Sequence, residues 1–251
     1  SYLNGAMDLT LAAAEVDVLE DRTEGWIAAL QLAALSMQGR DDPASFLNGF
    51  AGDDRFILDY LTDEVLNRQT TEVRNFLIDT SILSRLSGPL CAAVTGEHDA
   101  QATLDELDRS NLFLVPLDDR RTWYRYHHLF GEVLRARLLD EHPGRSPHLH
   151  RQASDWYAAN GEPHEAIVHA LVCDDPARAA ELIELAAPAM QQTRQESQLR
   201  SWLEALPADL YEDRPVLAMA LVGARMATGD VTGLEPLLEI IDSWLRRTDA
   251  P

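Results

Sequence analysis

The chain has 251 residues, of which 46% are hydrophobic and 25% charged, a composition typical of a globular protein with room for more than one folded unit. Its 21 Lys and Arg against 42 Asp and Glu give a formal net charge of -21, which disfavours DNA binding by the chain as a whole. The two cysteines, Cys91 and Cys173, have neither disulfide-framework nor zinc-ligand spacing and favour a reducing, cytoplasmic setting. No membrane partner is expected, because the chain has no run of roughly 20 apolar residues and no signal-peptide pattern.

Helical periodicity dominates the first 110 residues, with Gly, Pro and Asp separating the helices. We expect helices over residues 12–21, 25–38, 43–50, 54–68, 71–83, 87–95 and 99–110.

A pair of strands follows, over residues 112–117 and 122–127, joined by the turn-like DDRR. The second strand alternates its side chains, which gives it two distinct faces. Two helices separated by a turn at Gly96 lead into this hairpin, and a helix over 128–141 follows it. This order of elements is that of a winged helix-turn-helix.

Beyond residue 146 the pattern is helical throughout, and we expect helices over 146–159, 163–173, 176–193, 197–206, 214–228 and 232–247. Turns at 161–162, 195–196 and 229–230 recur every 34 residues, which is the tetratricopeptide period. Such arrays usually need about three repeats, so we expect the array to continue beyond Pro251. The predicted fold class is therefore mainly α, with one small hairpin.

Candidate catalytic and metal sites find little support. His164 and His169 are five residues apart, whereas helical ligand pairs usually lie three or four apart, so we interpret the histidines as scattered surface residues. The chain contains no Gly-x-Ser-x-Gly and no phosphate-binding loop. We predict that the chain by itself has no catalytic residue, no metal and no cofactor, and is not an enzyme.

A stand-alone DNA-binding function is also disfavoured. The would-be recognition helix over 99–110 carries Asp99, Asp105, Glu106 and Asp108 against Arg109 alone. A basic cluster lies instead on the hairpin and the next helix, where we expect ion pairs with acidic neighbours: Arg120, Arg121, Arg125, Arg135 and Arg137. We expect core packing for Trp156, Trp202 and Trp244, with a ligand groove as the alternative.

Several runs carry a family resemblance, namely RTEGWIAALQLAALS (22–36), FAGDDRFILDYLTDEVL (50–66), FLIDTSILSRLSGPLCAAVTG (76–96), LDELDRSNLFLVPLDDRRTWYRYHHLF (104–130) and LHRQASDWYAANGEPHEAIVHAL (149–171). With them the chain resembles the large MalT-like regulators of the LuxR class, which are signal-transduction ATPases with numerous domains. The resemblance implies that residues 1–52 are a helical lid, 53–143 a winged helix with a small β-hairpin, and 144–251 the start of a tetratricopeptide-like superhelical sensor.

The same resemblance implies a nucleotide contact. In this class a histidine after the last winged-helix strand reaches the β-phosphate of bound ADP, and His127 in Tyr126-His127-His128-Leu129 matches it. An imidazole N–H near phosphate oxygens makes a charge-assisted hydrogen bond. Gly25-Trp26-Ile27 matches the lid motif whose third residue covers adenine, with Ile27 in place of proline; the alternative is that Trp26 and Ile27 pack in the core of the lid.

The resemblance further implies an internal, cytoplasmic fragment of an ATP-dependent transcriptional activator that couples its nucleotide state and inducer sensing to assembly and DNA binding. ADP or ATP with magnesium would be bound in the parent protein. The implied partners are its own upstream nucleotide-binding domain and downstream sensor, an unknown inducer and further copies of itself, with DNA bound only by a separate C-terminal domain. The alternative is a free-standing helical-repeat adaptor that binds a protein partner.

Overall fold

The computed structural model describes residues 17–18, 62, 65–110 and 113–248. The chain divides into two compact units between Ser146 and Pro147, and each unit is described by itself. Of the lid helices expected before residue 54, only Asp17 and Val18 are described, and both are helical; Trp26, Ile27 and the predicted boundary at 52 lie outside the described residues.

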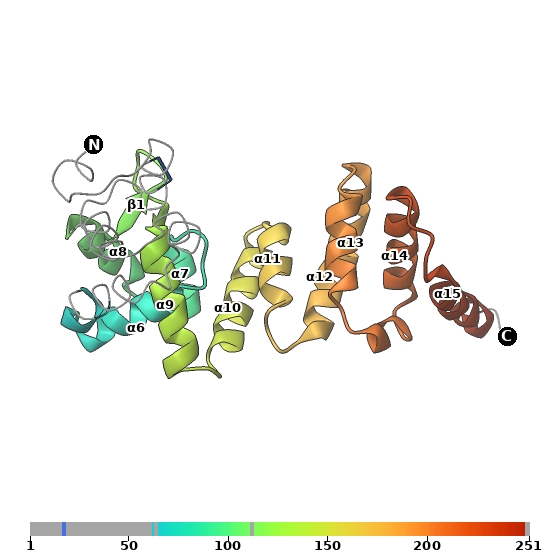
Figure 1. Cartoon of the computed structure of the whole chain (residues 1–251), viewed down its shortest axis with the longest axis horizontal. Helices are drawn as coiled ribbons and strands as arrows, with labels where there is room; N and C mark the ends of the chain where they lie inside the picture. Colours follow the sequence, from blue (N-terminus) through green and yellow to red (C-terminus); the bar gives the residue numbers. More distant parts are fainter. Residues whose placement is uncertain (1–16, 19–61, 63–64, 111–112, 249–251) are drawn as a thin grey trace, which may run out of the picture. The chain divides into compact units, whose positions relative to one another are not determined.

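The first unit follows the predicted order of elements (Figure 1). Its elements are η2 (Leu66–Arg68), α6 (Thr71–Thr80), α7 (Gly88–Thr95), α8 (Ala100–Arg109), β1 (Leu114–Pro116), β2 (Tyr124–Tyr126) and α9 (His128–Glu141). Thr70 caps α6 by accepting a hydrogen bond from the Val73 amide, and α7 ends at Gly96, whose φ of 79° suits glycine. The prediction of a mainly helical chain with a small antiparallel hairpin is confirmed.

The hairpin is tied down at both ends. β1 and β2 pair antiparallel with Leu114 opposite Tyr126, and the Asp118 carboxylate holds the turn by accepting hydrogen bonds from the Thr122 and Trp123 amides, both at 3.0 Å. On the other side of β2, Leu86 exchanges two backbone hydrogen bonds with Tyr124. The predicted alternation holds from Trp123 to Tyr126, since Tyr124 and Tyr126 are buried while Trp123 and Arg125 are half-buried, but His127, expected on the more exposed face, is buried as well.

Polar contacts inside the first unit join segments that are far apart in sequence. The hydroxyls of Thr80 on α6 and Tyr126 on β2 lie 2.6 Å apart in the core. Arg74 on α6 forms an ion pair of 2.6 Å with Glu141 at the end of α9. Asp79, which is 3% exposed, forms a further ion pair with Arg145. These contacts fix α6, β2 and α9 against one another.

The second unit consists of α10 (Ser146–Ala159), α11 (Pro163–Ala170), α12 (Pro176–Gln192), α13 (Glu196–Glu204), η3 (Ala208–Tyr211), α14 (Pro215–Ala227) and α15 (Leu234–Thr248). From α11 to α15 each α-helix packs on the next along the chain (Figure 1). Proline starts α11, α12 and α14, where its missing N–H costs nothing. Pro188 lies inside α12 and interrupts its hydrogen bonding.

The three predicted turns of this unit share one geometry. At each turn, a backbone amide donates a hydrogen bond to the carbonyl oxygen five residues earlier, as in a Schellman motif. The residue before that amide has the left-handed backbone conformation. The bonded pairs are Glu162 with Tyr157, Gln195 with Met190 and Asp230 with Arg225, after the left-handed residues Gly161, Arg194 and Gly229. The left-handed residues lie 33 and 35 positions apart, so equivalent helix ends recur close to the expected 34-residue spacing, with Arg194 in place of glycine at the middle one.

Two expectations about side chains need correction. Trp202 is buried and Trp156 half-buried, but Trp244 is 39% exposed, because α15 packs mainly on α14 and leaves much of its own surface open. The histidines are not all surface residues, since His127 and His169 are buried. Among the described helices, none is both long and apolar enough to cross a lipid bilayer.

Candidate functional site

The backbone of His127 is held at the junction of β2 and α9. Its amide donates to the Phe113 carbonyl at 2.7 Å, which continues the pairing of the hairpin by one residue. Its carbonyl accepts from the Gly131 amide at 2.9 Å, which makes His127 the N-cap of α9. The position of the residue is therefore set by the strand on one side and by the helix on the other.

The His127 side chain is buried among aromatic rings. Its ring stacks on His128 with centroids 5.0 Å apart and meets the edge of Phe113 at 6.4 Å. Phe113 in turn packs on Phe130, at 5.0 Å between centroids. His128 and Phe113 contact the imidazole and restrict its direction, as a contact to a phosphate oxygen requires. The lid residues Trp26 and Ile27 lie outside the described residues, so their approach to a nucleotide stays a prediction.

The basic cluster of the wing is largely occupied within the protein. Arg121 pairs with Asp108 at 2.5 Å, and Arg137 approaches Asp140 at 3.9 Å, as predicted. Arg135 instead donates to the carbonyl oxygen of Ser81, at 3.3 Å, and Arg125 donates to that of Tyr126. These four guanidinium groups therefore help to hold the fold.

The surface of α8 keeps the acidic character that its sequence predicts. Asp99, Asp105 and Glu106 are exposed, and Asp108 is the partner of Arg121. A phosphate backbone approaching this helix would meet carboxylates, so the recognition position of the winged helix is unfavourable for DNA.

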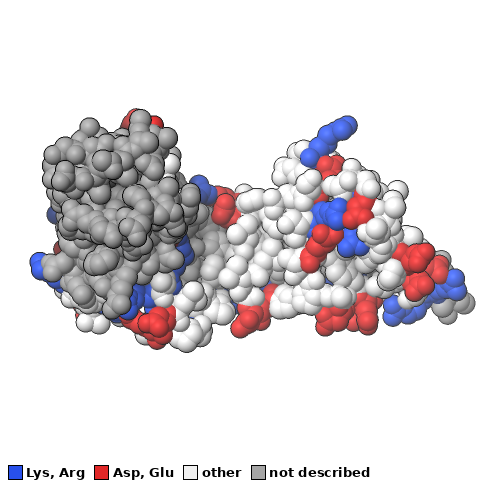
Figure 2. Space-filling model, viewed as in Figure 1, with Lys and Arg blue, Asp and Glu red and all other residues white. Residues whose placement is uncertain are grey.

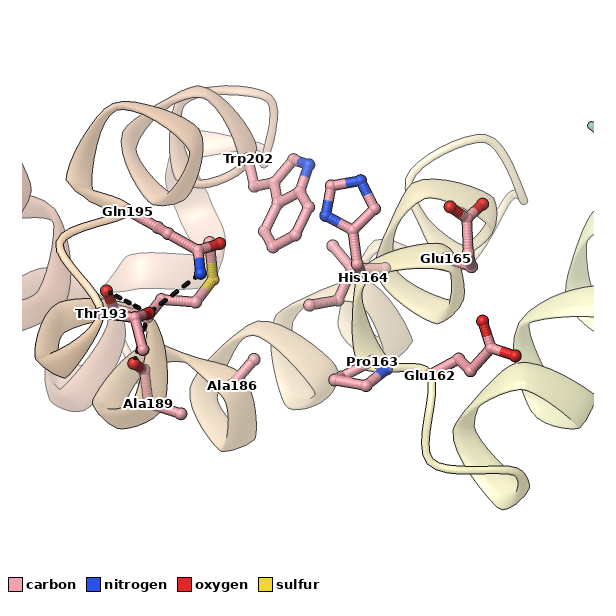
Figure 3. Close-up of a pocket in the computed structure, with 11 residues that line it drawn as sticks. Glu162, Pro163, His164, Glu165, Ala186, Ala189, Thr193, Gln195 and Trp202 are labelled. Atoms are coloured by element: carbon pink, nitrogen blue, oxygen red, sulfur yellow. Dashed lines mark hydrogen bonds between the residues drawn. The ribbon is translucent and has the colours of Figure 1, made fainter.

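A cavity in the second unit was not predicted from the sequence. It measures about 500 Å³ and lies between α11, α12 and α13. Its lining residues are Glu162, Pro163, His164, Glu165, Ile167, Ala186, Ala189, Met190, Thr193, Gln195 and Trp202 (Figure 3). The sequence-based alternative of a ligand groove had included Trp202. The other lining residues could not be predicted, because they are single residues on three different helices.

A part-buried histidine pair joins α10 and α11, with His169 buried and His150 half-buried. The Nδ1 atoms of His150 and His169 lie 2.8 Å apart, and Tyr157 stacks on the His169 ring at 5.5 Å. Burial lowers the pKa of His150 and lowers that of His169 to about 4. The pair is therefore neutral at pH 7. Within the described part of the chain, no three His, Cys, Asp or Glu residues gather in a group that could hold a metal ion.

The family model of the MalT winged helix domain matches residues 62–146, which contain α6 to α9, the hairpin and His127. The chain carries a MalT winged helix domain. The resemblance to MalT-like regulators is thereby confirmed.

Two relatives extend the likeness beyond this domain. The serine/threonine-protein kinase PknK of Mycobacterium tuberculosis is 36% identical over all 251 residues, which are 23% of that kinase. The HTH-type transcriptional regulator MalT of Klebsiella pneumoniae is 42% identical over 157 residues, which are 62% of this chain and 17% of that regulator. The chain thus spans less than a quarter of the length of either relative.

Proposed function

We propose that the chain is a regulatory segment of a cytoplasmic, ATP-dependent transcriptional activator of the LuxR class, with a tetratricopeptide-like sensor and no catalytic activity of its own. The match of residues 62–146 to the MalT winged helix domain carries this proposal. Relatedness to the transcriptional regulator MalT supports it. The nucleotide, its magnesium ion and the DNA would be bound by other domains of the parent protein.

In this proposal His127 contacts the bound nucleotide and makes the conformation of the regulator depend on it. The residues present fit a phosphate, because a buried imidazole of restricted direction stands at the end of the hairpin. A bound ADP would supply the β-phosphate oxygens, and His127 would donate one charge-assisted hydrogen bond to them. Since a ligand favours the conformation that it binds better, this bond would bias the regulator towards its resting state.

The test is His127→Ala in the parent regulator. Loss of one charge-assisted hydrogen bond of roughly 1.5–3 kcal/mol should weaken ADP binding about 10- to 150-fold. The variant should purify with less ADP, measured by chromatography, and should activate a reporter with less inducer. His128→Ala is the neighbouring control and should have the smaller effect. Unchanged ADP content and inducer dependence in His127→Ala would contradict the role.

The chain assayed alone gives a second test. It has no phosphate loop, and its α8 exposes carboxylates, so it should neither hydrolyse ATP nor shift duplex DNA. Turnover above the blank, or a salt-sensitive shift at micromolar protein, would contradict the proposal.

A second candidate is a regulatory segment of a serine/threonine kinase. It is favoured by the match to PknK, which covers the whole chain, whereas the match to MalT covers 62% of it. The parent protein separates the two candidates when assayed for phosphate transfer to serine or threonine and for DNA binding. A parent that does neither, and that holds no nucleotide, would favour the free-standing adaptor.

A further inference from the structure

The cavity between α11, α12 and α13, called here the α11–α13 cavity, has the size of a small-molecule site. Its volume of about 500 Å³ falls within the roughly 300–1,000 Å³ usual for such sites. It lies wholly within the second unit and is built by three consecutive helices. Its shape therefore depends on how these three helices pack on one another.

One wall of the cavity is aromatic and apolar. The indole of Trp202 is 5% exposed and lies 5.0 Å from the exposed His164 ring, centroid to centroid. Ile167, Met190 and the alanines of α12 supply aliphatic surface. Figure 3 shows the two rings side by side, with Pro163 and Ala186 on the opposite side of the hollow. A flat or aliphatic group can bury its surface here.

The polar groups of the cavity are arranged to accept hydrogen bonds. The Gln195 amide nitrogen donates to the Thr193 hydroxyl at 2.9 Å, and that hydroxyl donates to the Ala189 carbonyl at 2.9 Å. This chain orients the Gln195 amide, and Figure 3 shows its oxygen on the side of Trp202. The cavity thus offers the amide oxygen of Gln195, whose orientation is favoured by the hydrogen bond that its nitrogen donates.

The charge of the lining is negative. Glu162 and Glu165 stand at one side of the cavity (Figure 3), and its eleven lining residues include neither Lys nor Arg. Glu165 also lies in the first turn of α11, where a carboxylate is favoured by the helix dipole. The local potential attracts cations and repels anions, because the lining carries two carboxylates and neither Lys nor Arg.

We propose that the α11–α13 cavity binds a small organic ammonium ion with an aromatic or aliphatic body. The body packs on Trp202, and the ammonium group donates to the Gln195 oxygen and is attracted by Glu162 and Glu165. An ammonium group over the indole face gains cation–π attraction as well. Binding does not depend on the proposed regulatory function. If the chain is a sensor, such a ligand acts at this place.

The experiment compares two probes of opposite charge on the 251-residue chain. The probes are 2-phenylethylammonium and 3-phenylpropionate, which share a phenyl ring on a two-carbon linker. Titrations followed by ligand-observed NMR and calorimetry should give saturable binding of the ammonium probe at millimolar concentration or below. The carboxylate probe should bind at least tenfold more weakly. Equal binding of the two probes, or no saturable binding of the ammonium probe up to about 10 mM, overturns the proposal.

Matched variants locate the binding. Ala189 lines the cavity and is exposed, so Ala189→Phe should fill the cavity without unfolding α12 and should abolish ammonium binding. Leu185→Phe enlarges a residue of the same helix that is 79% exposed and outside the lining, and should bind as wild type does. Ammonium binding that survives Ala189→Phe places the probe elsewhere and overturns the proposal.

The charge requirement has its own control. The double variant Glu162→Gln, Glu165→Gln should bind the ammonium probe about tenfold more weakly. The ratio of its affinities for the ammonium and carboxylate probes should fall by the same factor. Glu235→Gln removes a carboxylate of α15 that does not line the cavity and should leave both affinities unchanged. An unchanged preference in the double variant would show that charge does not select the ligand.

Discussion

The two units of this protein hold their helices together in different ways. In the winged unit, side-chain contacts join residues such as Thr80 and Tyr126, or Arg74 and Glu141, which are 46 and 67 positions apart. In the helical unit the contacts are shorter in range, as between Ser154 and Ala166, 12 positions apart, or Arg200 and Asp230, 30 apart. The winged unit is closed on itself, whereas α11 to α15 form a series of neighbours.

This difference predicts different responses to damage. A unit with non-local contacts folds and unfolds as a whole. The stability of a series of helices is roughly the sum over its neighbouring interfaces. Figure 2 shows arginines beside Asp and Glu on the visible face of the helical unit. Some of these pairs join separate segments: Arg214 at the start of α14 pairs with Glu184 on α12, and Arg200 on α13 pairs with Asp230 in the turn after α14.

The largest effect is expected in the core of the winged unit. Phe130 on α9 is fully buried between Phe113 and Tyr126, so Phe130→Ala should cost about 3–5 kcal/mol. Urea unfolding followed by circular dichroism should show one early transition, with the signal of α10 to α15 retained. Leu139→Ala, on the same helix at 60% exposure, is the control and should unfold as wild type does. A gradual loss of signal instead of a distinct transition would contradict cooperative behaviour of this unit.

In the helical unit the tryptophans should form a graded series. Trp202→Ala should cost about 3–5 kcal/mol, because the indole is 5% exposed between neighbouring helices. Trp244→Ala should cost less than about 1 kcal/mol, because its side chain is 39% exposed on α15. Thermal unfolding of both variants measures the difference. Equal melting temperatures of the two variants would mean that the exposure of a tryptophan does not determine how much it contributes to stability.

Acid should weaken the helical unit through the histidine pair. Burial lowers the His169 pKa to about 4, below the ordinary value of about 6.5, so between these values the unfolded chain binds the extra proton. Stability therefore falls as the pH drops from about 6.5 to 4, by up to about 3 kcal/mol. Unfolding free energies of wild type and His169→Gln across this range test it. The variant should lose most of the slope, and His98→Gln, at an exposed position, should keep it.

A smaller effect is expected for the buried hydroxyl pair of the winged unit. Thr80 donates to the Phe76 carbonyl, so Tyr126 donates to Thr80. Tyr126→Phe leaves Thr80 one partner short and should cost about 1–2 kcal/mol. A double-mutant cycle with Thr80→Val should show coupling between α6 and β2. Additive single effects would argue against this contact as a link between them.

The smallest effect is expected at the tip of the wing. Arg121 is 62% exposed in its pair with Asp108, and such pairs contribute about 0–1 kcal/mol. Arg121→Ala should therefore change the urea midpoint little, and less still in 1 M salt. A loss above about 2 kcal/mol would mean that the wing is held by this pair rather than by Asp118 and the strand register.

Local patterns predicted the elements well because each depends on its own sequence. The alternation in Thr122 to His127 located β2, and the glycines at 96, 161 and 229 located helix ends that require positive φ. Position 194 was harder, because its turn places an arginine in that conformation. The 3-10 helix at Ala208–Tyr211 was missed, since four residues carry no periodicity.

Contacts between elements could not be predicted in the same way. His150 and His169 are 19 positions apart on different helices, so no spacing rule brings their rings together. The α11–α13 cavity depends on three helices at once. His127 was found through a family resemblance, and its enclosure by Phe113 and His128 emerged only in the structure. The exposure of Trp244 depends on which helices pack against α15, and the sequence of α15 alone does not determine this.

Pro188 gives α12 a mechanical property that the other helices of the series do not share, within the described residues. A proline inside a helix removes one backbone hydrogen bond and makes that turn the easiest to bend. The missing bond would join position 188 to the Glu184 carbonyl, so the weakened turn contains Ala186, which lines the α11–α13 cavity. The start of α12 at Pro176 is about 18 Å away at 1.5 Å per residue, so a bend of about 10° displaces it by about 3 Å. A molecule that contacts the cavity wall would therefore act on α12 at the turn that bends most easily. A small movement there would become a larger displacement at the start of the helix.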